Sequence, residues 1–166
     1  GLKTPVFLDS TAKKGELYYY VVTAGNEIGT SAPSVEIPAN AGLPGPWLSA
    51  DIGKVTIPGY TEYNGRNFTL EGEGHDIGGK SDEFHFVYAP MVGQGTITAR
   101  IVRPMSSQWT KPGVMMRKTL DADSIHASAL LLPHWSGALV WRKEKGGETD
   151  TGSLRQLSEA HVIKKN

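Results

Sequence analysis

Short runs of β-forming residues recur along this chain and are separated by residues that favour turns. In the run Phe84–Tyr88, Phe84, Phe86 and Tyr88 share one face at period two. Thr96–Val102 alternates apolar and polar residues after a glycine-rich turn. Similar runs are Leu17–Ala24, Gly113–Leu120, Ile125–Leu132 and Ala138–Trp141. Their spacing of about 8–12 residues predicts an all-β fold of the sandwich or barrel type.

Helices are expected to be few. The 166 residues include 20 glycines and 10 prolines, spread along the chain without a period. Because both residue types disfavour helix interiors, this density indicates many turns. A weak helical pattern is visible only from Ser153 to His161, where no clear capping residues mark its ends.

Charge and cysteine content exclude several classes of function. The chain has 17 basic and 17 acidic residues, so its formal net charge is zero. This balance argues against nucleic acid or an anionic membrane surface as a partner, because neither would be attracted over a distance. No apolar run approaches the ~18–20 residues that a membrane-spanning helix needs, so no membrane insertion is expected. The absence of cysteine excludes disulfides, thiolate metal sites and a cysteine nucleophile.

A segment of small residues and prolines divides the chain. Residues 39–46 read Ala-Asn-Ala-Gly-Leu-Pro-Gly-Pro and follow a further proline at position 38. Such residues offer little side chain for a core, which is typical of a linker. The sequence therefore predicts a first part over residues 1–38 and a second part over residues 47–166.

A tyrosine-rich strand pattern identifies the first part. A turn glycine precedes alternating Tyr, Tyr, Val and Ala, and Asn and Gly follow in the next turn; the residues are Asp9, Gly15, Tyr18, Tyr20, Val22, Ala24, Asn26, Gly29 and residues 31–34. This pattern resembles the C-terminal part of a fibronectin type III domain, which implies that Tyr18 hydrogen-bonds back to the preceding corner. Such a domain has about 100 residues, so the other strands are expected to belong to a longer parent chain or to be replaced by packing on the second part.

The second part carries a different set of motifs. The most specific is Gly-Val-Met-x-Arg at residues 113–117, which follows a tryptophan and a lysine; others lie at residues 46–47, 51–53, 68–72, 74–77, 82–88, 98–101 and 126–127. Between Pro46 and Arg142 the chain resembles the concanavalin/laminin-G-like jelly rolls of secreted bacterial glycoside hydrolases and surface proteins. The resemblance implies a β-sandwich in a secreted or cell-surface protein, with glycans and other domains of the parent chain as partners. Beyond Arg142 the expected further strands are not evident, so the sandwich either closes differently or is truncated.

The acidic pairs do not indicate catalysis. A glycoside hydrolase needs two carboxylates that face one cleft. The nearest pairs, Glu71 with Glu73 and Asp121 with Asp123, lie among glycines or in an apparent turn between strands and are interpreted as solvated. The chain also lacks a Gly-x-Ser-x-Gly elbow, a metal-binding histidine spacing and a phosphate-binding glycine loop. We therefore expect an ancillary module and not an enzyme.

Ligand-binding candidates come from aromatic and hydrogen-bonding side chains. Sugars stack their C–H faces on flat rings, and Arg and His bond their hydroxyls. The candidate residues are Trp109, Trp135, Arg117, His126 and His85. Four of them have an alternative: the two tryptophans could cap the core, Arg117 could lie in a buried salt bridge, and His126 could cap a turn. Trp47 and Trp141 are expected in the core.

A calcium site is the one metal site considered, and no other cofactor is expected. Laminin-G-like sandwiches often bind calcium at their rim through carboxylates and carbonyls, as the resemblance implies. The candidate ligands near turns are Asp76, Asp82, Asp121 and Asp123.

The sequence thus favours a non-catalytic extracellular module that recognises carbohydrate or targets a larger secreted protein to its substrate. The alternative is a structural adhesion or filament subunit that self-associates by β-strand pairing between chains, because open strand edges accept further strands. An exposed Trp109 and Trp135 with a polar groove between them would favour the first hypothesis, and strand pairing at residues 4–37 the second.

Overall fold

The fold is all-β. The structure is a computed structural model that describes residues 7, 9–102, 107, 109–132, 136–154 and 159–163, with side chains up to Ser153. Among these residues there is no helix, and so none that could span a membrane. The strands are Leu17–Tyr20 (β1), Ile37–Asn40 (β2), Leu48–Ile52 (β3), Tyr60–Tyr63 (β4), Phe68–Glu71 (β5), Phe84–Tyr88 (β6), Thr96–Arg100 (β7), Gly113–Arg117 (β8), His126–Leu131 (β9), Gly137–Arg142 (β10), Asp150–Leu154 (β11) and Glu159–Ile163 (β12).

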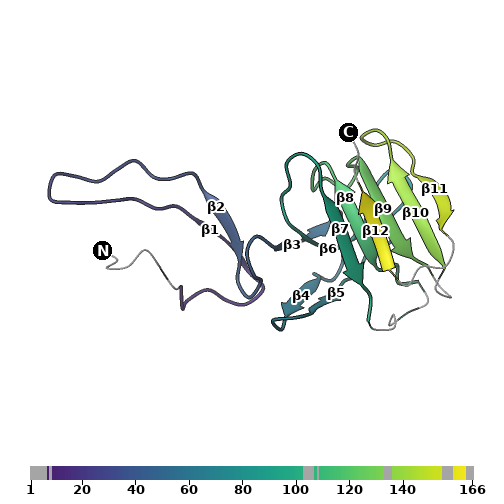
Figure 1. Ribbon diagram of the computed structural model, residues 1–166, viewed down its shortest axis with the longest axis horizontal. Coiled ribbons are helices and arrows are strands. Elements are labelled where there is room, and N and C mark those ends of the chain that lie inside the picture. The colour runs from purple at the N-terminus through teal and green to yellow at the C-terminus, as the bar shows by residue number, and fades with distance from the viewer. Residues whose placement is uncertain are drawn as a thin grey trace. The chain divides into compact units, whose positions relative to one another are not determined.

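The strands pair as one four-stranded sheet and four two-stranded sheets (Figure 1). The four-stranded sheet has the order β11-β10-β9-β8 and is antiparallel throughout. The two-stranded pairs are β1 with β2, β3 with β6, β4 with β5, and β7 with β12. Each run with a strong period-two or β-branched pattern contains a strand, which confirms the predicted all-β class.

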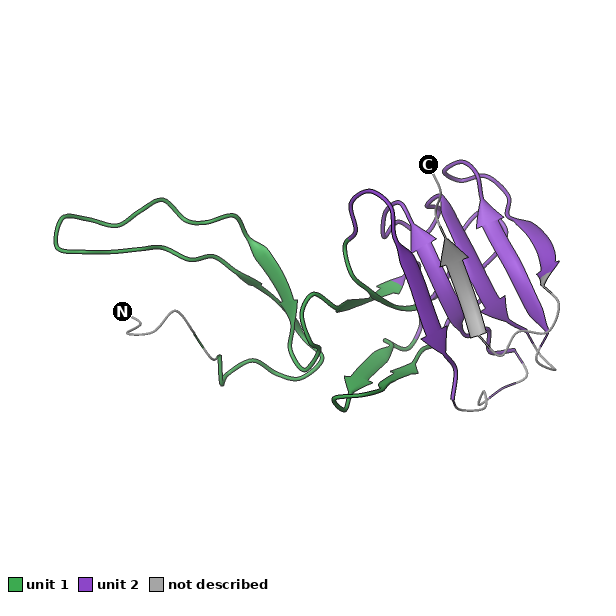
Figure 2. Cartoon of the chain, viewed as in Figure 1, with its two compact units in different colours: residues 1–51, 57–72, 85–90 green, residues 52–56, 73–84, 91–166 purple. Residues whose placement is uncertain are grey.

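Two compact units divide the chain differently from the predicted boundary. Residues 1–51, 57–72 and 85–90 form unit 1, and residues 52–56, 73–84 and 91–166 form unit 2 (Figure 2). The predicted linker over residues 39–46 begins inside β2, where Asn40 pairs with Leu17. The rest of the linker is also tied down, because Ala41 N donates to Glu16 O at 2.9 Å and Trp47 N to Pro44 O at 2.9 Å. Backbone hydrogen bonds thus join the predicted linker to β1 and close a turn within it.

The hairpin of β1 and β2 contains the hydrogen bond that was predicted for Tyr18. Its hydroxyl accepts from Lys13 N at 2.9 Å and donates to Glu16 Oε2 at 2.7 Å. Ile37, the partner of Tyr20 and therefore on the same face as Tyr18, is 56% exposed, and Tyr19 on the other face is 60% exposed. The hairpin therefore carries apolar side chains that no described residue of unit 1 covers.

The four-stranded sheet of unit 2 buries residues on both faces. On one face, Val114 and Ala129 form a cluster against which Ile97 and Ala99 of β7 pack. On the opposite face, a second cluster consists of Leu130, Ala138 and Val140, with Ile77 and Leu132 packed against it. A sheet with apolar residues on both faces needs a cover on each side, which is the arrangement of a sandwich.

The helix that the weak pattern at residues 153–161 suggested is not formed in the described part of this segment, so that prediction was wrong. Residues 150–154 form β11, which pairs with β10, and residues 159–163 form β12, which pairs with β7; residues 155–158 lie outside the described part. The partner of β11 is the preceding strand β10, whereas the partner of β12 lies about 60 residues earlier, so that second pairing is invisible to a local pattern. Their backbone hydrogen bonds outweigh a weak helical preference.

Trp47 and Trp141, which were expected in the core, are both half-buried. The ring of Trp47 lies 5.4 Å from that of Phe68, centroid to centroid. Trp141 lies on β10, opposite Asp150 of β11. Both side chains are therefore only partly enclosed, and neither lies in the buried core as expected.

Candidate functional site

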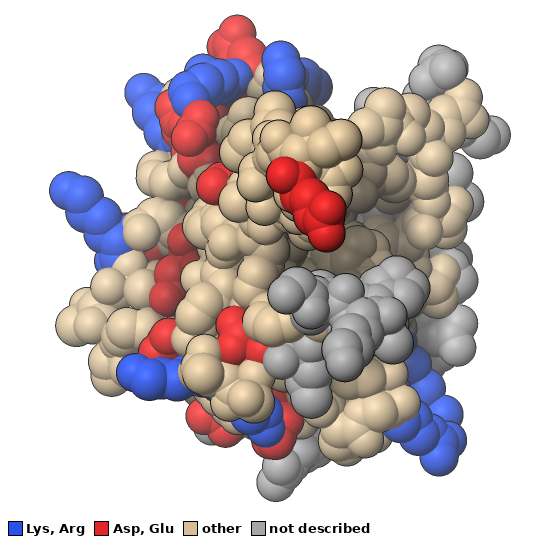
Figure 3. Space-filling view, turned by 90° about the vertical axis from the view of Figure 1, so that its left-hand side faces the viewer, with Lys and Arg blue, Asp and Glu red and all other residues tan. Residues whose placement is uncertain are grey.

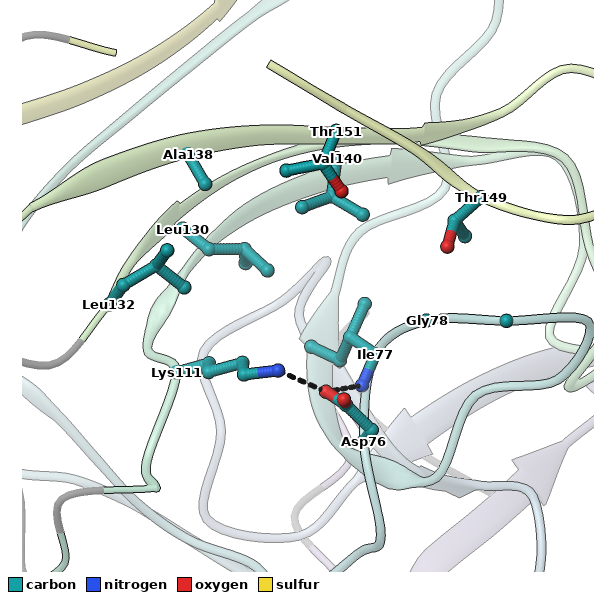
Figure 4. A pocket seen from close by; sticks show the side chains of 11 residues that line it. Asp76, Ile77, Gly78, Lys111, Leu130, Leu132, Ala138, Val140, Thr149 and Thr151 are labelled. Atoms are coloured by element: carbon teal, nitrogen blue, oxygen red, sulfur yellow. Dashed lines mark hydrogen bonds and ion pairs between the residues drawn. The ribbon is translucent and has the colours of Figure 1, made fainter. Parts of the chain in front are cut away.

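A hollow of about 270 Å³ opens on one face of the four-stranded sheet (Figure 4). Its floor is aliphatic, and its rim carries an ion pair and two threonines. The lining residues are Asp76, Ile77, Gly78, Gly79, Lys111, Leu130, Leu132, Ala138, Val140, Thr149 and Thr151. The hollow is slightly smaller than the ~300–1,000 Å³ of most ligand pockets, and it combines an apolar floor with a few polar groups.

The polar rim centres on Asp76. Its Oδ1 accepts from Lys111 Nζ at 2.5 Å and from the backbone N of Ile77 at 2.6 Å. In Figure 4 the pair lies across the hollow from Leu130 and Ala138. Because the Lys111 side chain is 29% exposed and that of Asp76 44%, both groups remain within reach of a ligand.

The loop that bears Asp76 is held by backbone hydrogen bonds. Glu83 N donates to Asp76 O at 2.8 Å, and Thr149 N donates to Gly79 O at 3.1 Å. Gly79 has a φ of 58°, which glycine adopts without strain. The loop between the two anchors therefore keeps a fixed shape beside the sheet.

Trp109 is 75% exposed and lies two residues before Lys111 in the chain. Its backbone N donates to Ser107 Oγ at 3.1 Å, and Thr110 N donates to Ser107 O at 3.2 Å. Of the two interpretations of Trp109, the structure shows the exposed ring and not the ring folded over the core. The other candidate tryptophan, Trp135, lies outside the described residues.

Arg117 and His126 are not at the surface but in a buried cluster with Asp82 and Arg142. The side chain of Arg117 is 2% exposed, and its Nη1 lies 3.4 Å from Asp82 Oδ2. Its guanidinium also lies 5.4 Å from the centroid of the Phe84 ring. Burial lowers the pKa of Arg117, although Asp82 opposes that effect. Arg117 thus adopts the buried salt bridge, so it cannot reach a glycan at the surface.

His126 is neutral in this cluster. Its side chain is fully buried, and burial, together with the positive charges of Arg142 and Arg117, lowers its pKa to about 4 against the pull of Asp82. Its Nδ1 lies 2.9 Å from Ser128 Oγ, while Nε2 has no hydrogen-bond partner among the described residues and lies 3.8 Å from Asp82 Oδ2. Because the ring is uncharged, this last approach is not an ion pair.

His85 bridges two strands in unit 1. Its Nδ1 lies 2.7 Å from Asp51 Oδ1, and its Nε2 lies 2.7 Å from Thr61 Oγ1. The carboxylate–imidazole–hydroxyl order is that of an acid–base relay, yet the Thr61 residue is only 5% exposed. The ring is wedged between glycines: a Cβ at Gly59 would lie 2.2 Å from its Nδ1, and one at Gly72 would lie 2.5 Å from its Cβ. Because both ring nitrogens already have partners, His85 has a structural role and has no ring nitrogen left to bind a ligand.

The four aspartates predicted for calcium do not come together. Asp82 is bound by buried arginines, Asp76 pairs with Lys111, and Asp121 and Asp123 share Lys145 at 2.5 and 3.2 Å. In the described part of the chain, no group of three or more His, Cys, Asp or Glu side chains could hold a metal. These residues do not fit a calcium ion, because each carboxylate already faces a cation.

A second hollow of about 280 Å³ in unit 2 is lined mainly by polar residues, which include Lys54, Thr56, Glu73, His75 and Glu83. It brings two carboxylates to one cavity. However, the general acid of a glycoside hydrolase is kept protonated by apolar surroundings, whereas Glu73 is exposed and the other lining side chains are mostly polar or charged. Asp121 and Asp123 lie in a turn between strands, as expected, and both pair with Lys145.

Charged side chains of both signs are mixed on one face of the molecule (Figure 3). On the face shown in Figure 3, acidic and basic residues are interspersed among uncharged ones, and neither sign forms a continuous field. This pattern agrees with the net charge of zero.

No family model, no curated protein and no solved structure matches the chain.

Several site residues were missed by the sequence analysis. Lys111, Thr149 and Thr151 line the hollow, but their types are common and they come from two separate segments. The one available signal was the position of Lys111 two residues after Trp109, a candidate ligand-binding residue. Asp82 and Arg142 lie 60 residues apart, so their pairing had no local signature.

Proposed function

We propose that this chain is a non-catalytic extracellular module that binds carbohydrate, or targets a larger secreted protein to a polysaccharide. The observation that carries the proposal is the hollow of Asp76, Lys111 and the aliphatic floor, with an exposed Trp109 two residues from its lysine. A sugar ring needs a flat apolar surface for its C–H face and fixed polar groups for its hydroxyls. Trp109 provides a flat apolar surface, and the rim of the hollow provides the polar groups.

The finer fold belongs to the same proposal. Residues 1–38 are the C-terminal part of a fibronectin type III domain, and residues 47–166 form a concanavalin/laminin-G-like jelly roll. The hydrogen bond from Lys13 N to the Tyr18 hydroxyl supports the first assignment, because it has the form of a tyrosine corner. The antiparallel sheet with apolar residues on both faces supports the second.

A glycan array probed with the purified chain tests the function. We expect binding to at least one class of glycan, at least a tenfold loss of affinity in Trp109→Ala, and retention in the control Trp109→Phe, which keeps a flat ring. Reducing sugar released from the bound glycan is measured in parallel. We expect no release, because Glu73 and Glu83 are not expected to hydrolyse the glycan. Absence of binding to every glycan would contradict the proposal.

A second candidate function is assembly through the β1–β2 hairpin. Large apolar residues are exposed along it and its long connection; they are Tyr19, Val22, Ile28, Val35 and Ile37. Strand addition from a neighbouring chain would cover them. Light scattering over a hundredfold range of concentration tests this candidate. A monomer throughout argues against it, and an oligomer that dissociates in Tyr19→Ser supports it.

A further inference from the structure

The floor of the hollow in unit 2 is closely packed and aliphatic. Ala138 pairs directly with Leu130 across β9 and β10, and Val140 follows on the same face. These three residues are 2%, 3% and 6% exposed, so their positions are set by the core. A sugar hydroxyl pressed against this floor would lose its hydrogen bonds to water without replacement, whereas a methyl group would lose none.

Hydrogen-bonding groups remain available at the rim. Lys111 has three N–H donors and uses one of them on Asp76 Oδ1. Asp76 Oδ2 accepts no hydrogen bond from any described residue. It lies 3.7 Å from the position that a Cβ on Gly78 would take, and Thr149 Oγ1 lies 3.8 Å from that position. A free acceptor, a free donor and a hydroxyl thus surround one opening above the apolar floor (Figure 4).

An acetamido group has the complementary chemistry. It is planar, and it presents one N–H donor, one carbonyl acceptor and a terminal methyl. We propose that the hollow binds the acetamido group of an N-acetylated amino sugar. Its N–H donates to Asp76 Oδ2, its carbonyl accepts from Lys111 Nζ, and its methyl contacts Leu130, Ala138 and Val140. This inference rests on the proposed carbohydrate-binding function and names its ligand class.

Related sugars fit less well. A neutral hexose would place a hydroxyl where the floor requires an apolar group. A free amino sugar would be attracted by Asp76 but repelled by Lys111, and it would leave the floor empty. The carboxylate of a uronic acid would be attracted by Lys111 but repelled by Asp76. The paired charges of Asp76 and Lys111 therefore select a neutral group that both donates and accepts.

Calorimetry with three β-1,4-linked tetramers tests the inference. The ligands are the tetramers of N-acetylglucosamine, glucose and glucosamine, which differ only at the second carbon. We expect the N-acetylglucosamine tetramer to bind at least tenfold more tightly than the other two, which corresponds to about 1.4 kcal/mol.

Two variants test whether the ligand binds in this hollow. In Gly78→Leu the new side chain fills the opening, and the nearest atom to its Cβ is 3.7 Å away, so the fold has room for it. Its control is Gly29→Leu, where a Cβ would meet nothing within 4 Å. Lys111→Met removes the donor and keeps the length of the side chain. Circular dichroism melts establish that each variant is folded. We expect at least tenfold weaker binding in Gly78→Leu and Lys111→Met and no change in Gly29→Leu.

The outcomes separate the inference from the function on which it rests. Equal binding of the acetylated and non-acetylated tetramers, or undiminished binding in folded Gly78→Leu, overturns the inference and leaves the carbohydrate-binding function standing. Binding of other glycans on the array, with no binding of the acetylated tetramer, has the same meaning. Absence of binding to every glycan overturns both.

Discussion

Arg142 and Asp82 form a two-pronged ion pair in the interior of unit 2. Nη2 of Arg142 donates to Oδ1 of Asp82 at 2.8 Å, and Nη1 donates to Oδ2 at 3.0 Å. Both side chains are fully buried. Arg142 also donates to the carbonyl oxygens of Gly79, Ser124 and Gly147 at 3.0, 2.9 and 3.0 Å. One guanidinium therefore ties three loops to the sheet.

Removal of the charge on Asp82 should be severely destabilising. Asp82→Asn leaves Arg142 and Arg117 buried without a counter-charge, and breaking a buried pair from one side costs about 3–5 kcal/mol. The measurement is the free energy of unfolding from urea denaturation. The control is Asp150→Asn, which removes an exposed partner of Lys143 and should leave the denaturation midpoint unchanged. Equal midpoints for the two variants would refute the central role of Asp82.

His126 should make the protein less stable in weak acid. Its folded pKa of about 4 lies below the value of 6.5 for an exposed histidine, so the unfolded chain binds a proton more readily in that interval. Stability from this group is complete above pH 6.5 and is lost as the pH falls from 6.5 toward 4, by about 3 kcal/mol at most. Urea denaturation at pH 7.5, 5.5 and 4.5 measures the loss.

The control for this pH dependence is His126→Gln, which should flatten the curve between pH 6.5 and 4. The hydrogen bond from Lys145 lowers the pKa of Asp121 from its usual 3.8, so the contribution of this carboxylate to stability changes mainly at pH values below those measured. A wild-type curve that is as flat as that of the variant would contradict the assignment.

Gly53 and Gly65 provide a matched test of close backbone packing. Both have positive φ, 75° and 90°, so alanine at either site incurs the same conformational strain of about 1 kcal/mol. A Cβ at Gly53 would lie 2.3 Å from the carbonyl oxygen of Asp82, whereas one at Gly65 would meet nothing within 4 Å. We expect Gly65→Ala to lose about 1 kcal/mol and Gly53→Ala at least about 2 kcal/mol more. Similar losses in urea denaturation would show that the contact at Gly53 relaxes freely.

The relay through His85 should be structural. Thr61→Val keeps the shape of the side chain but leaves Nε2 of His85 without its partner, at an expected loss of about 1–3 kcal/mol. Thr69→Val on the neighbouring β5 is the control, since Thr69 is exposed and should change little. Thermal denaturation compares the two. A loss no larger than that of the control would show that the bond to Thr61 contributes nothing.

The predictable parts of the fold were those with local patterns. Residues 84–88 form β6 with the predicted bounds, because three aromatic residues alternate along one face. Tyr18 also makes its predicted hydrogen bond, since the corner lies only five residues away. Residues 159–163 became a strand because β7, far away in sequence, supplies the partner.

The candidate site was less predictable for the same reason. For Arg117 the buried salt bridge was one of two alternatives, but its partner Asp82 lies 35 residues away. His126 and His85 were considered for sugar contacts, and tertiary packing encloses both. The hollow requires Asp76, Lys111 and Thr149 to meet from three segments, and no spacing in the sequence brings them together.

The hydrogen bonds to Gly79 fix the backbone beside the hollow but leave the side chains at its rim free to be substituted. Its carbonyl accepts from both Arg142 and Thr149 N, so the loop on one side of the hollow is already ordered when a ligand arrives. The conformational entropy of that loop is lost during folding and not during binding. Substitutions of the Thr149 or Thr151 side chains can therefore change the preferred ligand while the frame persists. Specificity of this hollow is open to gradual redesign at its rim, one side chain at a time.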